Sequence, residues 1–165
     1  MEEDDAWMRL ALEEAQQAAA AGEIPIGAVL VVGGAPIARG HNRRETWQDP
    51  TAHAELIAIR SAAAALASWR LLDSALYVTM EPCAMCVGAA ILARVQRLIF
   101  GVADPKGGAC GSIFNIPEER RLNHHLEVRG GVLEKESQEL LQQFFRSLRA
   151  TATSPGTDST IGLPE

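Results

Sequence analysis

The stretch Leu76-Tyr77-Val78-Thr79-Met80-Glu81-Pro82-Cys83-Ala84-Met85-Cys86 decides the fold. Its first four residues are apolar or β-branched, which is typical of a buried strand. Pro82 suits the first position of a helix, so we expect a helix over residues 82–93. Cys83 and Cys86 are three residues apart and share one face of that helix. The stretch therefore predicts a strand that leads directly into a helix carrying two thiols.

Strands and helices alternate on both sides of this stretch, and Gly33-Gly34 is a hairpin signal between two apolar runs. The expected elements are a helix from Asp4 or Asp5 to Gly22, strands over 26–32 and 36–39, a helix over about 51–66, a strand over 76–79, a helix over 82–93, strands over 97–102 and 126–129, and a helix over about 134–149. Alternation of this kind is typical of parallel strands covered by helices. The sequence predicts an α/β fold with a mixed, roughly five-stranded sheet that the chain enters by a hairpin.

The 165 residues, 47% of them hydrophobic, suffice for one globular domain over residues 1–150. The tail over 151–165 is rich in Thr, Ser, Gly and Pro, and we expect it to be disordered. The longest apolar runs are far shorter than the ~20 residues that span a bilayer, and the first residues are acidic where a secretory signal is basic. We therefore expect a cytoplasmic protein with no membrane partner.

The formal net charge of −6 argues at first sight against a nucleic-acid partner. However, the first fourteen residues carry −5 of this charge, so that the remainder of the chain sums to only −1. A local basic surface that binds phosphate remains compatible with this distribution.

Two elements of the sequence suggest a metal site. Three cysteines in a chain with no export signal argue against a disulfide framework, and Cys-x-x-Cys in a reducing compartment is typical of a metal site or a redox centre. His53 and Glu55 form a His-x-Glu element, and Glu55 lies 28 residues before Cys83. A thioredoxin-like redox pair has no such partner, so the metal interpretation is favoured over the redox one.

The spacing also predicts where the ligands meet. His53 and Glu55 are two residues apart, about 200° of rotation on a helix, so they serve one site only if it lies off the helix end. Asp49-Pro50-Thr51 supplies cap-like residues, which places both side chains in the first turn. Both ligand helices then begin at the carboxyl edge of a sheet, where α/β folds bind ligands. For zinc we expect distances near ~2.0 Å to nitrogen and ~2.3 Å to sulfur.

One histidine and two cysteines leave the fourth position of a tetrahedral zinc open for water. Glu55 can then take a proton from that water and pass it to a substrate, which is hydrolytic chemistry. A fourth protein ligand, either His41 or Cys110, would instead close the site and make it structural. We expect the open form, because a closed site leaves Glu55 without a task.

His53-Ala54-Glu55 together with Pro82-Cys83-Ala84-Met85-Cys86 resembles the signature of the cytidine-deaminase-like zinc deaminases. Four longer segments resemble the bacterial tRNA adenosine deaminases of the TadA family over about residues 5–149. These segments are Glu23-Ile24-Pro25-Ile26-Gly27-Ala28-Val29, Asp49-Pro50-Thr51-Ala52-His53-Ala54-Glu55, Leu76-Tyr77-Val78-Thr79-Met80-Glu81-Pro82-Cys83 and Gly107-Gly108-Ala109-Cys110-Gly111-Ser112. The resemblance implies a three-layer α/β/α fold and a homodimer. It also implies a hydrolase that converts adenosine to inosine at the first anticodon (wobble) position of a tRNA, an arginine tRNA above all.

The resemblance also implies roles for individual residues. His53, Cys83 and Cys86 would bind one zinc ion per subunit, and Glu55 would move protons. Asn42 would hydrogen-bond the flipped adenine, although by itself it is typical of a turn. Further expected roles are pocket walls for Ile26 and Val29 and backbone N–H donors at Ala54 and Cys83.

The expected RNA contacts lie later in the chain. The resemblance assigns Asp104 to a ribose 2′-hydroxyl and Lys106 to phosphate, where the residues alone predict a surface turn. It places Phe144, Phe145, Arg146 and Arg149 on an RNA-facing helix, whereas their spacing alone predicts core phenylalanines and solvated arginines.

Some features depart from the family pattern and leave alternatives open. The tail after Arg149 has no Lys or Arg, and His41 and Arg44 flank Asn42-Arg43 where relatives differ. One alternative is a zinc deaminase of a free base or nucleoside such as cytosine, cytidine or guanine. Another is a zinc-stabilised RNA-binding module with no catalytic activity.

Overall fold

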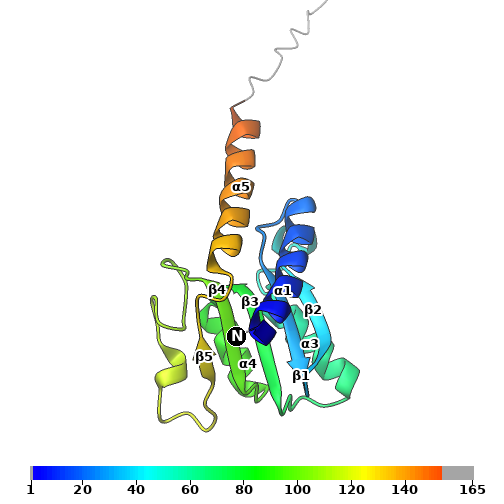
Figure 1. Cartoon of the computed structure of the whole chain (residues 1–165), viewed down its shortest axis with the longest axis vertical. Coiled ribbons are helices and arrows are strands. Elements are labelled where there is room, and N and C mark those ends of the chain that lie inside the picture. The colour runs from blue at the N-terminus through cyan, green and yellow to red at the C-terminus, as the bar shows by residue number, and fades with distance from the viewer. Residues whose placement is uncertain (1, 154–165) are drawn as a thin grey trace, which may run out of the picture.

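The computed structural model describes residues 2–153, which form a five-stranded sheet in the order β2-β1-β3-β4-β5 with helices on both faces. The elements are α1 (Glu2–Ala20), β1 (Gly27–Val32), β2 (Ala35–His41), α2 (Arg44–Trp47), α3 (Ala54–Leu66), β3 (Ser74–Met80), α4 (Ala84–Leu92), β4 (Arg97–Val102), the 3-10 turn η1 (Ile116–Glu118), β5 (Glu127–Arg129) and α5 (Glu134–Ala152). In Figure 1, α1 lies in front of the sheet and α3 and α4 lie behind it. The predicted α/β fold with a mixed sheet is confirmed.

The direction of the strands brings two helix starts to one edge. β1 pairs antiparallel with both β2 and β3, and β3, β4 and β5 are parallel. Because β2 and β3 are both antiparallel to β1, they run in the same direction and their carboxyl ends share one edge of the sheet. α3 follows β2 and α4 follows β3, so both helices begin at that edge, as the sequence predicts.

The core consists of two layers, one on each face of the sheet. Leu30, Leu76 and Leu98 point to the face covered by α3 and α4. Val29 and Tyr77, with the period-2 alternation of a strand, point to the opposite face, where they pack against α1. These side chains are at most 1% exposed. The two layers hold the sheet rigidly between the helices.

Gly40 allows the metal-site helix to approach the sheet closely. A Cβ atom at this position would lie 2.6 Å from the carbonyl oxygen of Ala54 and 3.0 Å from the amide nitrogen of Ala58. Only a residue without a side chain fits there, because the backbone of α3 lies directly against β2. This contact fixes the start of α3, and with it His53, relative to the sheet.

Several boundaries differ from the expected ones. α3 and α4 begin at Ala54 and Ala84, later than expected, because His53 and Cys83 have extended backbones. The short helix α2 lies between the strand expected over 36–39 and the helix expected from about 51, where the sequence predicts no helix or strand. α5 continues to Ala152 and projects beyond the sheet in Figure 1, so residues 151 and 152 of the expected tail are helical. The rest of the tail expectation, over 154–165, lies outside the described residues.

Among residues 2–153, no helix is both long enough and apolar enough to cross a membrane.

Asp4 ties α1 to the far strands of the sheet. It is 5% exposed, and its carboxylate accepts hydrogen bonds from the Tyr77 hydroxyl at 2.8 Å, from Arg97 at 3.3 Å and from Arg129. Burial alone would raise the pKa of Asp4, but the hydrogen bond from Tyr77 and the charges of the two arginines outweigh it, so that the pKa is lowered. The ionised form of Asp4 therefore stabilises the fold.

The substitution Asp4→Asn is expected to lower the free energy of unfolding by about 2 kcal/mol at neutral pH, because hydrogen bonds to a buried charge are lost. Since the pKa is lower in the folded protein, this stabilisation is present above the unfolded-state value of ~3.9 and is lost as the pH falls through the folded-state value. Urea unfolding at several pH values measures the effect. The exposed control Glu3→Gln should change little, and a difference for Asp4→Asn that does not shrink in acid would contradict the assignment.

Candidate active site

His53 and Cys83 occupy equivalent positions at the starts of two helices. His53 is the residue before α3, with φ −80° and ψ 149°, and Cys83 is the residue before α4, with φ −73° and ψ 171°. Glu55 and Cys86 lie in the first turns of the same helices. His53 therefore lies one position before the first turn in which the sequence had placed it, and both helix N-termini point at one spot.

The three predicted metal ligands lie together. His53 Nδ1 is 3.7 Å from Cys83 Sγ and 3.5 Å from Cys86 Sγ, and the two sulfur atoms are 3.7 Å apart. A tetrahedral ion with Zn–N near ~2.0 Å and Zn–S near ~2.3 Å requires ligand separations of about 3.5–3.8 Å. The donor atoms, one imidazole nitrogen and two sulfurs, thus match a zinc site in both chemistry and spacing.

The site favours a negative charge on sulfur. The hydrogen bond from Cys86 and that from His53 outweigh the effect of burial and lower the pKa of Cys83 to about 3. The same hydrogen bond, together with burial, raises the pKa of Cys86. A divalent cation bound here would favour the thiolate form of both residues.

Glu55 is a buried carboxyl group beside this cluster. It is 4% exposed, and burial raises its pKa to about 7. A carboxyl group with a pKa near neutrality can both accept and release a proton at physiological pH. Its position and its pKa fit the proton-carrying role that the sequence assigned to it.

The cluster opens into a small pocket. Its walls come from the segment before β1, the loop after β2, the starts of α3 and α4, and the ends of β3 and β4. The lining residues are Ile24, Ile26, Asn42, Arg44, His53, Ala54, Glu55, Met80, Glu81, Cys83 and Asp104. Among the predicted substrate contacts, Ile26, Asn42, Ala54 and Asp104 line this pocket.

Asn42 is 5% exposed and is held by the backbone around it. Its side-chain amide donates to the carbonyl oxygen of Ile24 at 3.3 Å, and its side-chain oxygen accepts from the N–H of Arg44 at 3.1 Å. An amide side chain has a second N–H and a second lone pair, which remain for a ligand. Asn42 therefore both stabilises the turn and presents polar groups to the pocket.

Val29 does not reach the pocket, so this prediction is wrong. Its side chain is fully buried against Met8 and Tyr77, on the face of the sheet that α1 covers. Side chains alternate along a strand, so Val29 and Val31 of β1 point away from α3 and α4, whose N-terminal ends carry the metal cluster. Ile24, in the segment before β1, lines the pocket together with Ile26, and sequence reasoning missed it.

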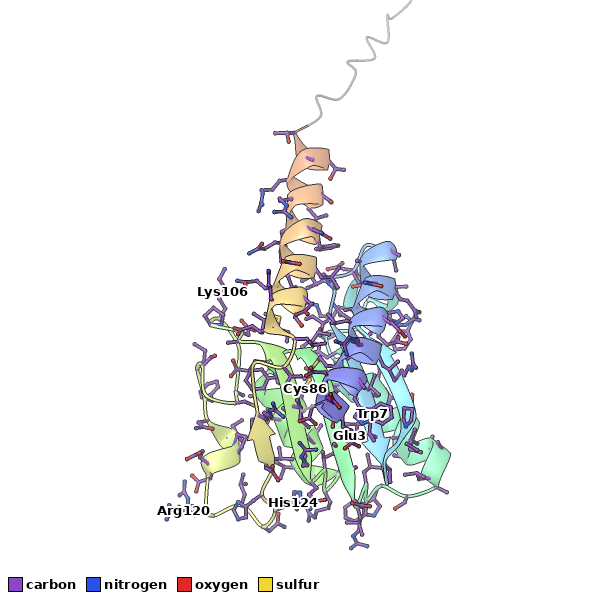
Figure 2. All side chains as sticks on the ribbon, in the orientation of Figure 1. Glu3, Trp7, Cys86, Lys106, Arg120 and His124 are labelled. Atoms are coloured by element: carbon purple, nitrogen blue, oxygen red, sulfur yellow. The ribbon has the colours of Figure 1, made fainter. Side chains whose placement is uncertain are left out.

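Asp104 and Lys106 lie on the loop after β4 but differ in position. Asp104 lines the pocket, and its side chain accepts a hydrogen bond at 3.0 Å from the N–H of Lys106. The Lys106 side chain is exposed and points away from the body in Figure 2. Lys106 thus lies outside the pocket, where it can reach only the surroundings of a bound molecule.

Phe145 and Arg146 are also outside the pocket, on α5. They line a separate surface groove together with Leu141 and Arg149. Phe145 is 40% exposed, and its ring packs edge-on against that of Phe144, with 5.5 Å between the ring centroids. The expectation of core phenylalanines is therefore wrong for Phe145, because the outer half of α5 has no sheet beneath it.

Two further acidic residues near the pocket were missed as candidates. Glu23 and Glu81 are only 1% and 4% exposed, and each lies next to an apolar segment of the chain. A carboxylate placed between buried strand residues and a proline, as in Glu81-Pro82, is the signal that could have found Glu81.

Neither alternative fourth ligand joins the cluster. Within the part of the chain that the structure describes, the group of potential metal ligands consists of His53, Cys83 and Cys86. His41 is engaged elsewhere, with its Nδ1 2.8 Å from a carboxylate oxygen of Glu14. The donor set therefore has the three-ligand form of catalytic zinc sites.

Comparisons with known proteins agree with this geometry. Residues 2–149 match the MafB19-like deaminase family. The tRNA-specific adenosine deaminase of Bacillus subtilis is 52% identical over 149 residues, which is 90% of this chain and 92% of the relative. The enzyme of the same name from Haemophilus influenzae is 49% identical, over 88% of this chain and 85% of the relative.

Solved structures show the same relationship. One of them comes from a study of A-to-I editing by tRNA:A34 deaminases at the wobble position of transfer RNA. It is 47% identical in sequence, its TM-score is 0.79, and the match covers 82% of this chain and 98% of that chain. A guanine deaminase from Nitrosomonas europaea is 28% identical, with a TM-score of 0.72 over 85% of this chain and 83% of that one. The higher identity lies with the tRNA-acting proteins, and the chain belongs to the MafB19-like deaminases and, among them, to the tRNA-specific adenosine deaminase family.

Proposed function

We propose that this protein hydrolyses adenosine to inosine in tRNA at the wobble position of the anticodon, with an arginine tRNA as the substrate. The observation that carries the proposal is the position of Glu55, a buried carboxyl group that lines the same pocket as His53 and Cys83 of the metal-ligand cluster. The names of the relatives support tRNA as the substrate class. With tRNA as the substrate, the proposal places the enzyme in the cytoplasm.

Zinc is the metal that the donor set fits best, one ion per subunit. Imidazole and two thiolates at these separations suit zinc, and hydrolysis needs no change of oxidation state. When bound, zinc supplies Lewis acidity that makes water a stronger nucleophile at neutral pH. His53, Cys83 and Cys86 would hold it.

The protein's own task in the reaction is to move protons. Water forms a bond to C6 of adenine, the bond between C6 and the amino group breaks, and ammonia leaves. Glu55 accepts a proton from the attacking water, delivers a proton to ring nitrogen N1, and assists protonation of the leaving amino group. Ala54, the first residue of α3, lines the pocket, and we assign its N–H as a donor to the reacting centre.

Asn42 is assigned to recognition of the base, so Asn42→Ala is expected to raise KM. The loss of hydrogen bonds to the base costs about 1.4 kcal/mol, or roughly tenfold in KM. Steady-state kinetics on an anticodon stem-loop RNA measure this. The inference fails if KM is unchanged. Thr51→Ala, at an exposed position three residues before α3, serves as the control.

The contacts with the rest of the RNA belong to residues outside the pocket. Asp104 is placed to accept from a ribose hydroxyl, and Lys106 extends from the same loop to meet phosphate. Phe145 and Arg146 would add stacking and charge from α5.

A homodimer is part of the proposal. Large apolar side chains are exposed along α4 and the loop after β4, which contacts α4 through η1. They are Met85 at 37%, Leu92 at 70%, Ile113 at 52% and Phe114 at 56% exposure. Such a surface favours burial against a second copy. Sedimentation at twice the chain mass of 17.7 kDa supports the dimer, and sedimentation at the single mass contradicts it.

A substrate panel tests the proposed reaction. The protein is incubated with an arginine tRNA that carries A34 and, separately, with adenosine, cytidine, cytosine and guanine, and ammonia is measured. We expect turnover of the tRNA alone. Turnover of a free base without turnover of tRNA would point to the nucleobase alternative, and absence of any turnover by zinc-loaded protein to a binding module.

A further inference from the structure

Two loops flank the pocket, and each of them is attached to a buried carboxylate. The first, over 42–47 after β2, includes the short helix α2 and contributes Asn42 and Arg44 to the lining, and the second, over 104–112, contributes Asp104. Glu23 and Glu81, the carboxylates concerned, form none of the ion pairs found within residues 2–153. Buried carboxylates are normally paired with a cation, so these two require another explanation.

Glu81 is enclosed by the second loop. Its carboxylate accepts hydrogen bonds from the N–H groups of Asp104 at 3.0 Å, Cys110 at 2.9 Å and Ser112 at 3.1 Å, and from the Ser112 hydroxyl. A Cβ atom at Gly108 would lie 2.3 Å from the carboxyl carbon, so glycine is required for this approach. Both ends of the loop therefore converge on one carboxylate.

The same loop is joined to the turn that carries Cys83. The N–H of Ala109 donates to the carbonyl oxygen of Pro82 at 2.8 Å, and Gly108 forms an isolated β-bridge with Cys83. Glu81 precedes these residues directly in the chain. It thereby sets the position of Asp104 relative to the metal cluster.

Glu23 has the equivalent task on the other side of the pocket. Its carboxylate accepts from the N–H of Thr46 at 2.6 Å and from that of Glu45 at 3.2 Å, which are amides of the first turn of α2. The residue before α2, Arg43, makes no side-chain capping bond, so the cap comes from Glu23, more than twenty residues away. This contact holds α2 and, with it, the adjoining turn at Asn42.

We propose that Glu23 and Glu81 are positioning residues, which fix the two walls of the pocket at the separation that the substrate nucleotide requires. This inference rests on the proposed function and deepens it. Glu81 also lines the pocket, but the oxygens of both carboxylates accept hydrogen bonds from loop donors, so we assign them to positioning Asn42 and Asp104 and not to the reacting atoms. Their loss should therefore weaken substrate binding and leave the metal cluster and Glu55 intact.

The variants Glu23→Gln and Glu81→Gln test the proposal. Each replaces one acceptor oxygen by an amide NH2 group, which is a donor and cannot accept hydrogen bonds from the loop N–H groups. With anticodon stem-loop RNA we expect KM to rise about tenfold, with kcat within about threefold of the parent value. Zinc content should not change. Amide hydrogen exchange, measured without substrate, should accelerate at Cys110 and Ser112 in Glu81→Gln and at Glu45 and Thr46 in Glu23→Gln.

Each variant is the control for the other loop, and Glu118→Gln, on the exposed surface of η1, is the control for charge. If Glu81→Gln does not fold, Ser112→Ala removes one donor and should show a smaller rise in KM. An unchanged KM despite faster local exchange would overturn the proposal, as would zinc loss with exchange raised throughout the protein. If the parent protein does not act on tRNA, the proposed function fails, whereas the exchange pattern still tests the attachment of the loops.

Discussion

Glu55→Gln is expected to lower kcat for tRNA deamination by about 10³-fold, because glutamine cannot accept or release the protons that the reaction moves. Glutamine has nearly the same size and can occupy the buried position of Glu55, which is 4% exposed. KM should change little, because the base is bound through other residues. Single-turnover kinetics with excess enzyme, read as inosine formed, measure the chemical step directly.

The control for Glu55→Gln is the parent protein's zinc content and Tm, both of which the variant should retain. A matched substitution at exposed Glu118, also to glutamine, should leave kcat unchanged. Full activity of Glu55→Gln would remove the catalytic assignment and favour an RNA-binding module.

Cys86→Ser is expected to abolish both zinc binding at stoichiometric levels and deaminase activity. Cys86 is fully buried, and its sulfur is one of three donor atoms within 4.8 Å of one another. A hydroxyl is a poor zinc ligand, and two remaining ligands are too few for a stable site. We expect the zinc content, measured by mass spectrometry of the metal, to fall well below one per chain, with activity down by about 10³-fold or more.

Cys110→Ser is the matched control, since Cys110 is half-buried in the neighbouring loop and is not part of the donor group. It should retain both zinc and activity. If Cys110→Ser lost zinc to the same extent, Cys110 would be a fourth ligand and the site would be structural.

The predictions that succeeded rest on short-range patterns. A strand that leads into a helix and the three-residue spacing of Cys83 and Cys86 both follow from local sequence patterns. The exact start does not, because α4 begins at Ala84 and not at Pro82. The convergence of His53 with the two thiols followed from parallel strands sharing one carboxyl edge. The structure brings the three donors together as that reasoning requires.

The predictions that failed depend on which side of an element a residue faces. Val29 lies in an apolar run whose every member looks equally buried, so the sequence does not tell which alternate side chains face α1. Ile24 was missed for another reason, because it lies in the segment before β1, where no strand pattern indicates which way a side chain points. The hydrogen bonds of Glu23 and Glu81 join residues more than twenty positions apart, and no local pattern predicts them.

The position of the edited nucleotide tests the central claim most directly. An arginine tRNA with A34 is incubated with the zinc-loaded protein and reverse-transcribed, since inosine is read as guanosine. We predict conversion at A34 alone with the parent protein and none with Glu55→Gln. Unmodified A34 under conditions in which the protein carries zinc, or conversion at other adenosines of the tRNA, would contradict the account.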